Sequence, residues 1–417
     1  MGKHSYSIVP RVDAVVSSLD DLDMPIVSKR GAQAPSSPIR KLVPLADAAR
    51  MSGRRIHHLN IGQPDMETPA VMRAALAEYG EKVIAYGPSG GDVEFRDVLF
   101  EYYRSLGIKL KPHELIVTTG ASEAVHLALA TCLDHGDELL VPDPMYANYL
   151  GYGGVLGNRI RPIPTSVETG YHLPDDLEAY LTPRTRAVLM CNPANPTGAV
   201  YSEEEVQRVL DLCVKHDLFI IADEVYREFV YDDDVCRSVL AYPEAVGRAV
   251  VVDSLSKRYS LCGARIGCFV TNNEEIAAAA MKLAQARLSP PALAQVVASR
   301  ASRLPNDYFP RVKREYRQRR DTVYEALVDI PGVTVHRPEG AFYQMARLPV
   351  EDAETFVRYM LTEFHRDGQT VMLAPAAGFY AAPDAGRDEV RIAYVLEQEK
   401  LAQAMWLVEE ALHQFNG

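Results

Sequence analysis

The stretch Asp253–Gly267 reads D-S-L-S-K-R-Y-S-L-C-G-A-R-I-G and follows the apolar run Ala249–Val252, which predicts a buried strand. Lys257 stands among small hydroxyl residues in this stretch, and Arg265 follows eight positions later. A turn with a solvated lysine is one interpretation. The other is a lysine whose amine attacks a carbonyl while the hydroxyls and the arginine hold an anion, which explains why these residue types occur together.

The same stretch matches the pattern S-x-S-K-x-x-x-x-x-G-x-R-x-G through Ser254, Ser256, Lys257, Gly263, Arg265 and Gly267. In this respect the chain resembles the class I/II aminotransferases, which belong to the fold-type I superfamily of pyridoxal phosphate (PLP) enzymes. It looks most similar to bacterial aspartate/aromatic aminotransferases. The resemblance extends from about Leu42 to the C-terminus and implies that Lys257 forms a Schiff base with PLP.

Length and composition are those of a soluble globular protein of 417 residues, long enough for two domains. The formal net charge of -12 argues against a nucleic acid or an anionic membrane as partner. The six cysteines form no C-x-x-C pair, which indicates reduced thiols rather than a disulfide framework. No apolar run reaches transmembrane length and no signal peptide is evident, so we expect a cytoplasmic protein.

The resemblance implies an α/β protein of the PLP-dependent transferase fold type I. Its large PLP-binding domain, predicted over residues 75–305, would hold a mostly parallel seven-stranded sheet. A smaller α+β domain would combine residues 41–74 with residues 306–417. A long charged helix, about Pro310 to Val328, is expected to link the two domains, with its Arg and Lys run as a solvated face.

Residues 1 to about 40 are predicted to be an N-terminal extension. Val12–Leu22 could form a short helix, and the Pro and Ser content of Arg30–Pro38 predicts a loop. A flexible arm and an arm that crosses to a partner subunit are both compatible with this composition.

A phosphate site is predicted where the apolar run Leu115–Thr119 ends in Gly120-Ala121-Ser122 and a helix begins. Such a turn directs free backbone N–H groups at an anion, although any α/β unit can show it. Next to the basic side chain of Arg265 it becomes a candidate phosphate cup. The residues predicted to form the cup are Ala121, Ser122, Ser254 and Arg265.

An acidic residue follows the apolar strand Leu218–Ala222, at the edge where α/β sheets usually bind ligands. The resemblance implies that this residue, Asp223, pairs with the pyridine nitrogen of PLP. An exposed loop acid is the alternative interpretation, and it suits the next residue, Glu224, better. Tyr226, a little further on, would hydrogen-bond the phenolic oxygen of PLP.

Three further cofactor contacts are implied by the resemblance. Tyr146 would stack on the pyridine ring. Asn195, the second asparagine of N-P-A-N-P-T-G, would bind the same phenolic oxygen as Tyr226. Tyr86 would reach the PLP phosphate of a neighbouring subunit, which implies a homodimer with shared active sites. A tyrosine packed within its own loop is the alternative for Tyr86.

Substrate binding is predicted at three residues. Gly62 lies in the turn G-Q-P-D-M-E-T-P, which resembles a family turn over the active site. Arg391 lies in the apolar strand Val390–Val395, where a lone arginine is costly unless it is paired. The resemblance implies that Arg391 clamps the substrate α-carboxylate, with Asn195 beside it.

The predicted activity is transfer of an amino group from an L-amino acid to a 2-oxo acid such as 2-oxoglutarate, in a ping-pong cycle through pyridoxamine phosphate. Lys257, Asp223 and Tyr226 are the predicted catalytic residues. Where one aspartate-specific branch carries a lysine, this chain has Ser122, and Arg287 is the only nearby arginine available for a distal carboxylate. We therefore expect broad aspartate and aromatic specificity.

Two other functions remain open at this stage. One is a carbon–sulfur β-lyase, which uses PLP on the same fold. The other is a non-catalytic ligand-sensing domain fused to a DNA-binding head, for which the N-terminal extension is too short and too acidic. The eleven histidines show no metal-ligand spacing, so no metal site is expected.

Overall fold

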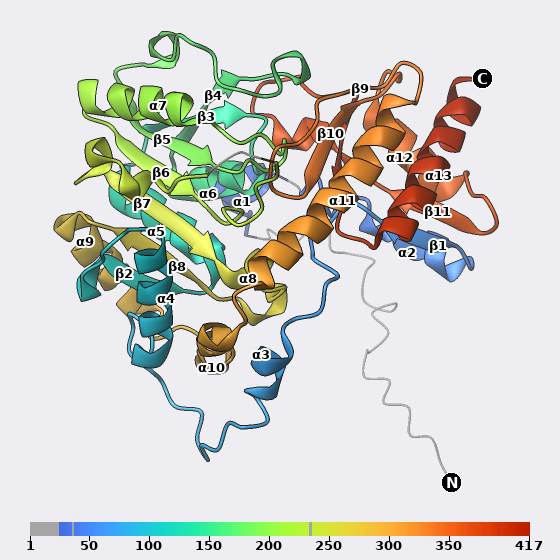
Figure 1. Ribbon diagram of the computed structural model, residues 1–417. Coiled ribbons are helices and arrows are strands. Elements are labelled where there is room, and N and C mark those ends of the chain that lie inside the picture. Colours follow the sequence, from blue (N-terminus) through green and yellow to red (C-terminus); the bar gives the residue numbers. More distant parts are fainter. Residues whose placement is uncertain (1–24, 36, 233–235) are drawn as a thin grey trace. The chain divides into compact units, whose positions relative to one another are not determined.

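The structure, a computed structural model, describes residues 25–35, 37–232 and 236–417 (Figure 1). The chain divides into two units, Met1–Ala34 and Pro35–Gly417. In the first unit, α1 (Lys29–Gln33) begins where Ser28 Oγ accepts a hydrogen bond from the backbone N–H of Gly31 at 3.2 Å. This capped turn corrects the predicted loop over Arg30–Pro38. The helix predicted over Val12–Leu22 lies outside the described residues.

The second unit contains a seven-stranded sheet with the strand order β2-β8-β7-β6-β5-β3-β4. Only β8 runs antiparallel to its neighbours, so the predicted mostly parallel sheet is confirmed. The strands are β2 (Leu115–Thr118), β3 (Glu138–Asp143), β4 (Arg159–Pro164), β5 (Thr185–Cys191), β6 (Phe219–Asp223), β7 (Ala249–Ser254) and β8 (Gly267–Thr271).

Helices cover both faces of this sheet, which is why its central strands are apolar on both sides. Ile221 of β6 packs in one core with α5 (Gly120–Cys132) and α9 (Glu274–Ala286), while Ile220 packs in the other with α7 (Glu203–Lys215). A capping box starts α7: Ser202 Oγ accepts from the Glu205 N–H at 3.2 Å. Further helices are α3 (Ala70–Ala74), α4 (Val93–Ser105), α6 (Asn148–Leu156) and α10 (Ala292–Ser299).

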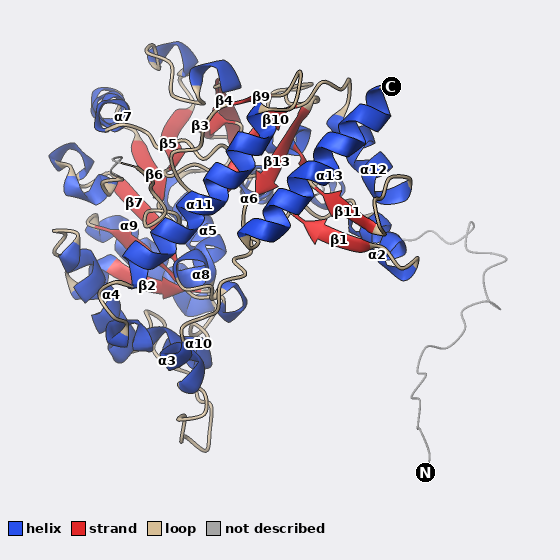
Figure 2. Ribbon diagram, turned by 45° about the vertical axis from the view of Figure 1, so that its right-hand side comes forward, coloured by secondary structure: helices blue, strands red, loops and turns tan. Residues whose placement is uncertain are grey.

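Two smaller sheets complete the second unit, and one of them joins segments from its two ends. The antiparallel order β12-β13-β10-β9 is built from β9 (Thr334–Val335), β10 (Tyr343–Arg347), β12 (Ala374–Pro375) and β13 (Glu389–Ala393). A parallel pair joins β1 (Arg55–His58) to β11 (Gln369–Met372). The helices packed on these strands are α2 (Val43–Met51), α12 (Ala353–Thr362) and α13 (Gln398–Asn416) (Figure 2). The domain boundaries predicted at residues 41, 75 and 306 stay a prediction.

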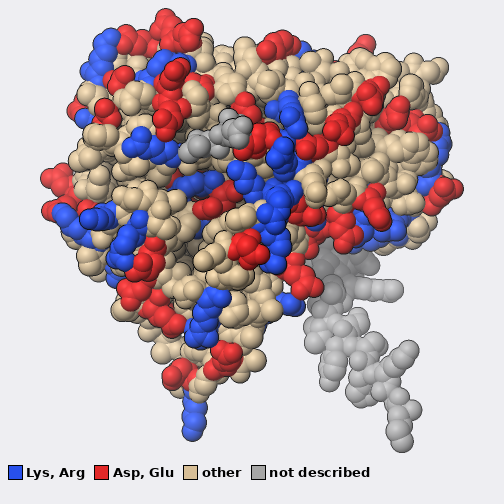
Figure 3. All heavy atoms as spheres, in the orientation of Figure 1, with Lys and Arg blue, Asp and Glu red and all other residues tan. Residues whose placement is uncertain are grey.

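Helix α11 (Tyr308–Val328) packs along α13 and against β10. Basic and acidic side chains lie side by side along its course on the surface (Figure 3). Two of its arginines are buried, however, which corrects the interpretation of the whole basic run as a solvated face. Arg319 pairs with Asp65 at 2.6 Å and Arg320 with Asp232 at 2.7 Å, because a buried guanidinium needs an acidic partner.

Candidate active site

A cavity of about 700 Å³ opens where β5, β6 and β7 end and α5 begins. The carboxyl ends of parallel strands are the usual ligand edge of such a sheet. The cavity is lined by every predicted site residue except Tyr86, which lies outside it and is 81% exposed. The predicted residues that line it are Gly62, Ala121, Ser122, Tyr146, Asn195, Asp223, Tyr226, Ser254, Lys257, Arg265 and Arg391.

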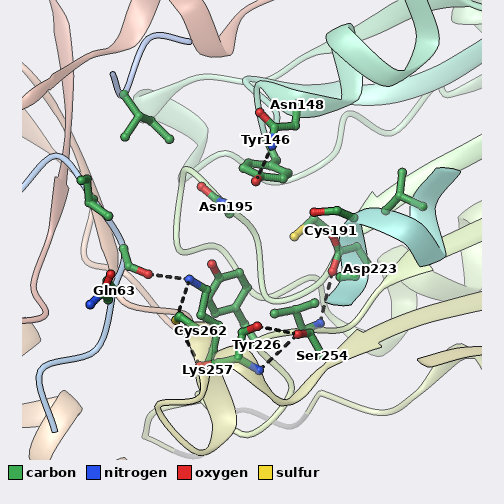
Figure 4. Close-up of a pocket in the computed structure, with 18 of the residues that line it drawn as sticks. Gln63, Tyr146, Asn148, Cys191, Asn195, Asp223, Tyr226, Ser254, Lys257 and Cys262 are labelled. Atoms are coloured by element: carbon green, nitrogen blue, oxygen red, sulfur yellow. Dashed lines mark hydrogen bonds between the residues drawn. The ribbon is translucent and has the colours of Figure 1, made fainter. Parts of the chain in front are cut away.

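Lys257 reaches the cavity from α8 (Leu255–Arg258), a single helical turn that starts directly after β7. Ser254 caps this turn, since its Oγ accepts from the Ser256 N–H at 3.1 Å. Lys257 Nζ donates to the carbonyl oxygen of Gly62 at 2.6 Å and lies 3.7 Å from Cys262 Sγ (Figure 4). Within the described ranges Lys257 forms no ion pair, so its amine is available for chemistry.

One end of the cavity is suited to a phosphate group. Ala121 and Ser122 belong to the first turn of α5, whose backbone N–H groups have no partner within the helix. The guanidinium of Arg265 lies against Gly120: a Cβ added there would be 2.7 Å from Arg265 Nη2. At Gly267 an added Cβ would be 2.9 Å from the Gly120 carbonyl carbon and 3.0 Å from the Ala121 nitrogen, so glycine is required for β8 to pass this close to the start of α5.

Asp223 ends β6, and its carboxyl group is almost fully buried at the base of the cavity. Tyr149 donates its hydroxyl to Asp223 Oδ2 at 2.6 Å, and the backbone N–H of Val225 donates to Oδ1 at 3.3 Å. Burial raises the pKa of Asp223 to about 6, although both hydrogen bonds act in the opposite direction. A cationic ring nitrogen placed here would restore the ionised form.

Arg391 lies at the centre of the four-stranded sheet, in register with Met345 of β10 and Ala374 of β12. It is 1% exposed, and burial lowers its pKa. Its Nη1 donates to Asn195 Oδ1 at 3.0 Å and its Nη2 to the carbonyl oxygen of Asn60 at 2.7 Å, while Nε has no partner among the residues that the structure describes. No carboxylate of the described residues pairs with Arg391, so its buried positive charge is suited to bind an anionic group of a ligand.

Aromatic side chains shape the remaining walls. The hydroxyls of Tyr226 and Tyr343 lie 2.7 Å apart, and burial raises the pKa of Tyr226. The ring of Tyr343 also lies 4.4 Å from the guanidinium carbon of Arg391. Asn148 donates to the hydroxyl of Tyr146 at 2.7 Å, and both lie across the cavity from Lys257 in Figure 4.

Several functional candidates are absent from the sequence-based prediction. Tyr149, Tyr343 and Asn148 contact predicted site residues, but they stand in ordinary aromatic or polar contexts in the sequence. Cys191 and Cys262 also line the cavity. Among these, only Tyr343 carries a sequence signal, since it follows the glycine of G-A-F-Y at a strand start.

Two interpretations are wrong. Arg287 does not line the cavity, because its guanidinium is bound to Glu123 Oε1 at 2.6 Å and to the carbonyl oxygens of Ser89 and Val117 at 3.0 and 2.7 Å. Glu224 is not an exposed loop acid. It is buried, and it pairs with Arg227 and accepts from the N–H of Val239 at 2.9 Å.

Comparison with known proteins agrees with this site. The family model described as aminotransferase class I and II matches residues 54–405. The chain is 31% identical to a probable aspartate/prephenate aminotransferase of Aquifex aeolicus, over 93% of this chain and 99% of that protein. It is also 31% identical to aromatic-amino-acid aminotransferase 2 of Thermococcus litoralis, over 90% and 95% of the two chains. An alanine aminotransferase structure from Pyrococcus furiosus superposes with a TM-score of 0.84, at 29% identity, over 93% of this chain and 100% of that one.

The chain therefore belongs to the class I and II aminotransferase family. It is a transaminase, and the predicted fold and reaction class are confirmed. The members of this family depend on PLP. The comparisons give no support to the carbon–sulfur lyase alternative. In the part of the chain that the structure describes, no helix has the length and apolar character needed to span a membrane.

Proposed function

We propose that this aminotransferase uses PLP to move an amino group from L-aspartate and aromatic L-amino acids to a 2-oxo acid such as 2-oxoglutarate. The buried guanidinium of Arg391, which has no acidic partner among the described residues, carries the proposal. It shares one cavity with the amine of Lys257 and the carboxyl group of Asp223. An amino acid offers both the carboxylate and the amino group that these residues suit.

Each polar group of PLP would have a suitable binding residue in the cavity. Lys257 would hold the cofactor covalently, Asp223 would pair with the protonated ring nitrogen, and Tyr146 would lie against the ring. Asn195 and Tyr226 would bind the ring hydroxyl. The phosphate would lie on the first turn of α5 and beside Arg265. The residues proposed for the phosphate are Ala121, Ser122, Ser254 and Arg265.

When bound, PLP supplies an electron sink that makes the Cα proton of an attached amino acid acidic. The protein residues bind the substrate and transfer the proton. Arg391 and Asn195 fix the substrate carboxylate, which orients the Cα–H bond toward Lys257. The amine of Lys257, held in place by the carbonyl oxygen of Gly62, would take up this proton and pass it to the C4′ carbon of the cofactor, and the reverse half-reaction would return a proton from C4′ to Cα. Asp223, once ionised, keeps the ring nitrogen protonated.

The relatives and the residues of the cavity wall support aspartate and aromatic amino acids as donors. One relative is named for aspartate and prephenate and another for aromatic amino acids. The walls combine apolar and aromatic groups, among them Ile39, Ile61 and Tyr152, with polar ones. Such a mixture suits a substrate side chain that is either flat and apolar or short and acidic.

A panel of amino donors assayed with 2-oxoglutarate tests the proposal. Aspartate, tyrosine and phenylalanine should each yield their oxo acid together with glutamate. Release of ammonia without glutamate would indicate lyase chemistry and overturn the proposal. Activity confined to donors outside these two classes would refute the specificity but leave transamination intact.

We also propose a homodimer in which Tyr86 contributes to the neighbouring active site. Tyr86, Val83 and Ile84 are all more than half exposed, in the connection between α3 and α4. Apolar side chains gathered on one loop favour a covering partner. Sedimentation at assay concentration should give a dimer, and an active monomer would contradict this assignment. Tyr86→Ala should weaken PLP binding without changing the sedimentation profile.

A further inference from the structure

One basic residue that lines the cavity has no role in the proposed function. Three arginines line it: Arg40, Arg265 and Arg391. Arg391 is suited to the α-carboxylate, and Arg265 lies at the first turn of α5, where it donates to the Cys262 carbonyl oxygen at 3.1 Å. Arg40 has no side-chain hydrogen bond or ion pair with any residue that the structure describes, and its side chain is exposed at the cavity.

The backbone that carries Arg40 is fixed next to the α-carboxylate site. The N–H groups of Arg40 and Lys41 both donate to the Ser37 carbonyl oxygen, at 3.1 and 3.0 Å, and form a tight turn. The Ile39 carbonyl oxygen accepts from Asn60 Nδ2 at 2.9 Å. The carbonyl oxygen of Asn60 in turn accepts from Arg391 Nη2 at 2.7 Å. A single residue, Asn60, therefore connects the Arg40 turn to Arg391.

The neighbours of Arg40 in this turn are engaged elsewhere. Lys41 forms an ion pair with Glu354 of α12, and Leu42 is buried in the core. Pro38 packs against Gly378, where an added Cβ would lie 2.5 Å from the proline Cβ. These contacts hold the turn in place, and Arg40 is the basic residue of the turn that lines the cavity.

The other residues considered for the distal group of a substrate do not fit. Ser122 carries no charge, and Arg287 lies outside the cavity with its guanidinium bound by three other groups. We propose that Arg40 binds the distal carboxylate of dicarboxylic substrates, namely aspartate, glutamate and their oxo acids. This inference rests on the proposed function and identifies the residue that reads the substrate side chain.

The same placement accommodates aromatic donors. Ile39 and Ile61 border the cavity beside Arg40 and offer an apolar wall for a ring. Because the arginine side chain is long and exposed, its charged end can turn to water when no carboxylate is present. Arg40 is thus a specificity-determining residue that adds affinity for one substrate class without excluding the other.

The test compares Arg40→Gln with Lys41→Gln, which removes a neighbouring charge that is directed away from the cavity. The donor half-reaction of the holoenzyme is followed by cofactor absorbance. No oxo acid is added, so the carboxylates of an acceptor do not affect the measured rate. Arg40→Gln should lower kcat/KM for aspartate on the order of 10- to 100-fold and leave that for phenylalanine nearly unchanged. Arg40→Lys should recover part of the loss. Lys41→Gln should resemble the wild type for both donors.

Equilibrium binding supplies a second measurement that does not depend on turnover. The affinity for maleate, measured by calorimetric titration, should fall by a similar factor in Arg40→Gln. The affinity for 3-phenylpropanoate should equal that of the wild type. Equal losses for both donors, or an unchanged ratio between them, would overturn the role of Arg40 and leave transamination standing. A wild-type enzyme that transaminates aromatic donors but no dicarboxylate would overturn it as well. An enzyme that transaminates no amino acid would refute the proposed function itself.

Discussion

The hydroxyl of Tyr149 lies 2.6 Å from Oδ2 of Asp223, and the two residues come from different elements, α6 and β6. Both are buried, and burial raises the pKa of Tyr149 well above its usual range, so the phenol stays a neutral donor. The hydrogen bond fixes the plane of the carboxyl group and favours its ionised form. Tyr149 is therefore a positioning residue for the group proposed to hold the ring nitrogen.

Replacing Tyr149 by phenylalanine should lower kcat about tenfold, which corresponds to the loss of one buried hydrogen bond of ~1.4 kcal/mol. The KM for the amino donor should change little, because Tyr149 does not line the cavity. Asp223→Asn should cost considerably more in kcat. Steady-state kinetics on both variants check this, and equal values for Tyr149→Phe and wild type would show that the bond has no catalytic effect.

Affinity for PLP should depend on pH through Asp223. The pKa of this carboxyl group in the free protein is about 6, and pairing with a cationic ring nitrogen should lower it. Affinity should therefore be constant above about pH 6 and should fall by up to about tenfold for each pH unit below it. Tyr149→Phe should move this inflection to higher pH. Titrations of Asp223→Asn separate the effect from protonation of the phosphate group, since this variant should keep only the phosphate dependence.

Lys257 should be the residue that carries the cofactor. Borohydride reduction of the holoenzyme followed by peptide mapping should label Lys257, because its amine is in the cavity and forms no ion pair within the described residues. Lys257→Ala should abolish the label and the activity. Lys282→Ala, at an exposed position on α9, should leave both intact. A label on another lysine in the wild type would contradict the assignment.

Arg391→Lys should weaken all amino donors by a similar factor. Lysine keeps the charge but loses the planar two-pronged geometry, and every amino acid presents the same α-carboxylate. The expected loss in kcat/KM is on the order of ten- to a thousandfold, for about 1.5–4 kcal/mol. Aspartate, tyrosine and phenylalanine should fall together. A loss confined to aspartate would transfer the distal-carboxylate role from Arg40 to Arg391.

His172 should contribute to stability in a pH-dependent way. Its Nδ1 lies 3.0 Å from Glu205 and its Nε2 3.2 Å from Glu339, and these hydrogen bonds raise its pKa to about 10. A raised pKa means that the stabilisation is complete below the unfolded value near 6.5 and is lost as the pH rises to about 10. The unfolding free energy of His172→Gln should be about 1 kcal/mol lower than wild type at pH 6. Denaturant titrations should show this difference vanish near pH 10, and a constant difference would contradict the argument.

The residues that could be predicted from the sequence are those that stand out from their neighbours. Asp223 follows an apolar strand, and Arg391 interrupts one, so burial forces each of them to have a partner. Lys257 stands out because small hydroxyl residues surround it. These contrasts are local, and local patterns suffice to place a side chain at the end or in the middle of a strand.

Tyr149 and Arg40 could not be predicted in this way. Tyr149 meets Asp223 only because α6 lies against the end of β6, a contact between residues 74 positions apart. The role of Arg40 depends on a hydrogen bond between Ile39 and Asn60, which are 21 positions apart.

Strand β4 went unpredicted because it contains two prolines, which are tolerated only because it is an edge strand.

The 3.0 Å bond between Arg391 and Asn195 joins a strand of the four-stranded sheet to the loop that follows β5 in the seven-stranded one. Substrate binding and proton transfer thus depend on residues of two different sheets, and this hydrogen bond helps to keep them aligned. The single tryptophan, Trp406, lies on α13 and not at this junction, so its fluorescence does not report directly on the hydrogen bond. Titration of intact active sites is therefore the measurement that shows whether a preparation keeps the two sheets aligned.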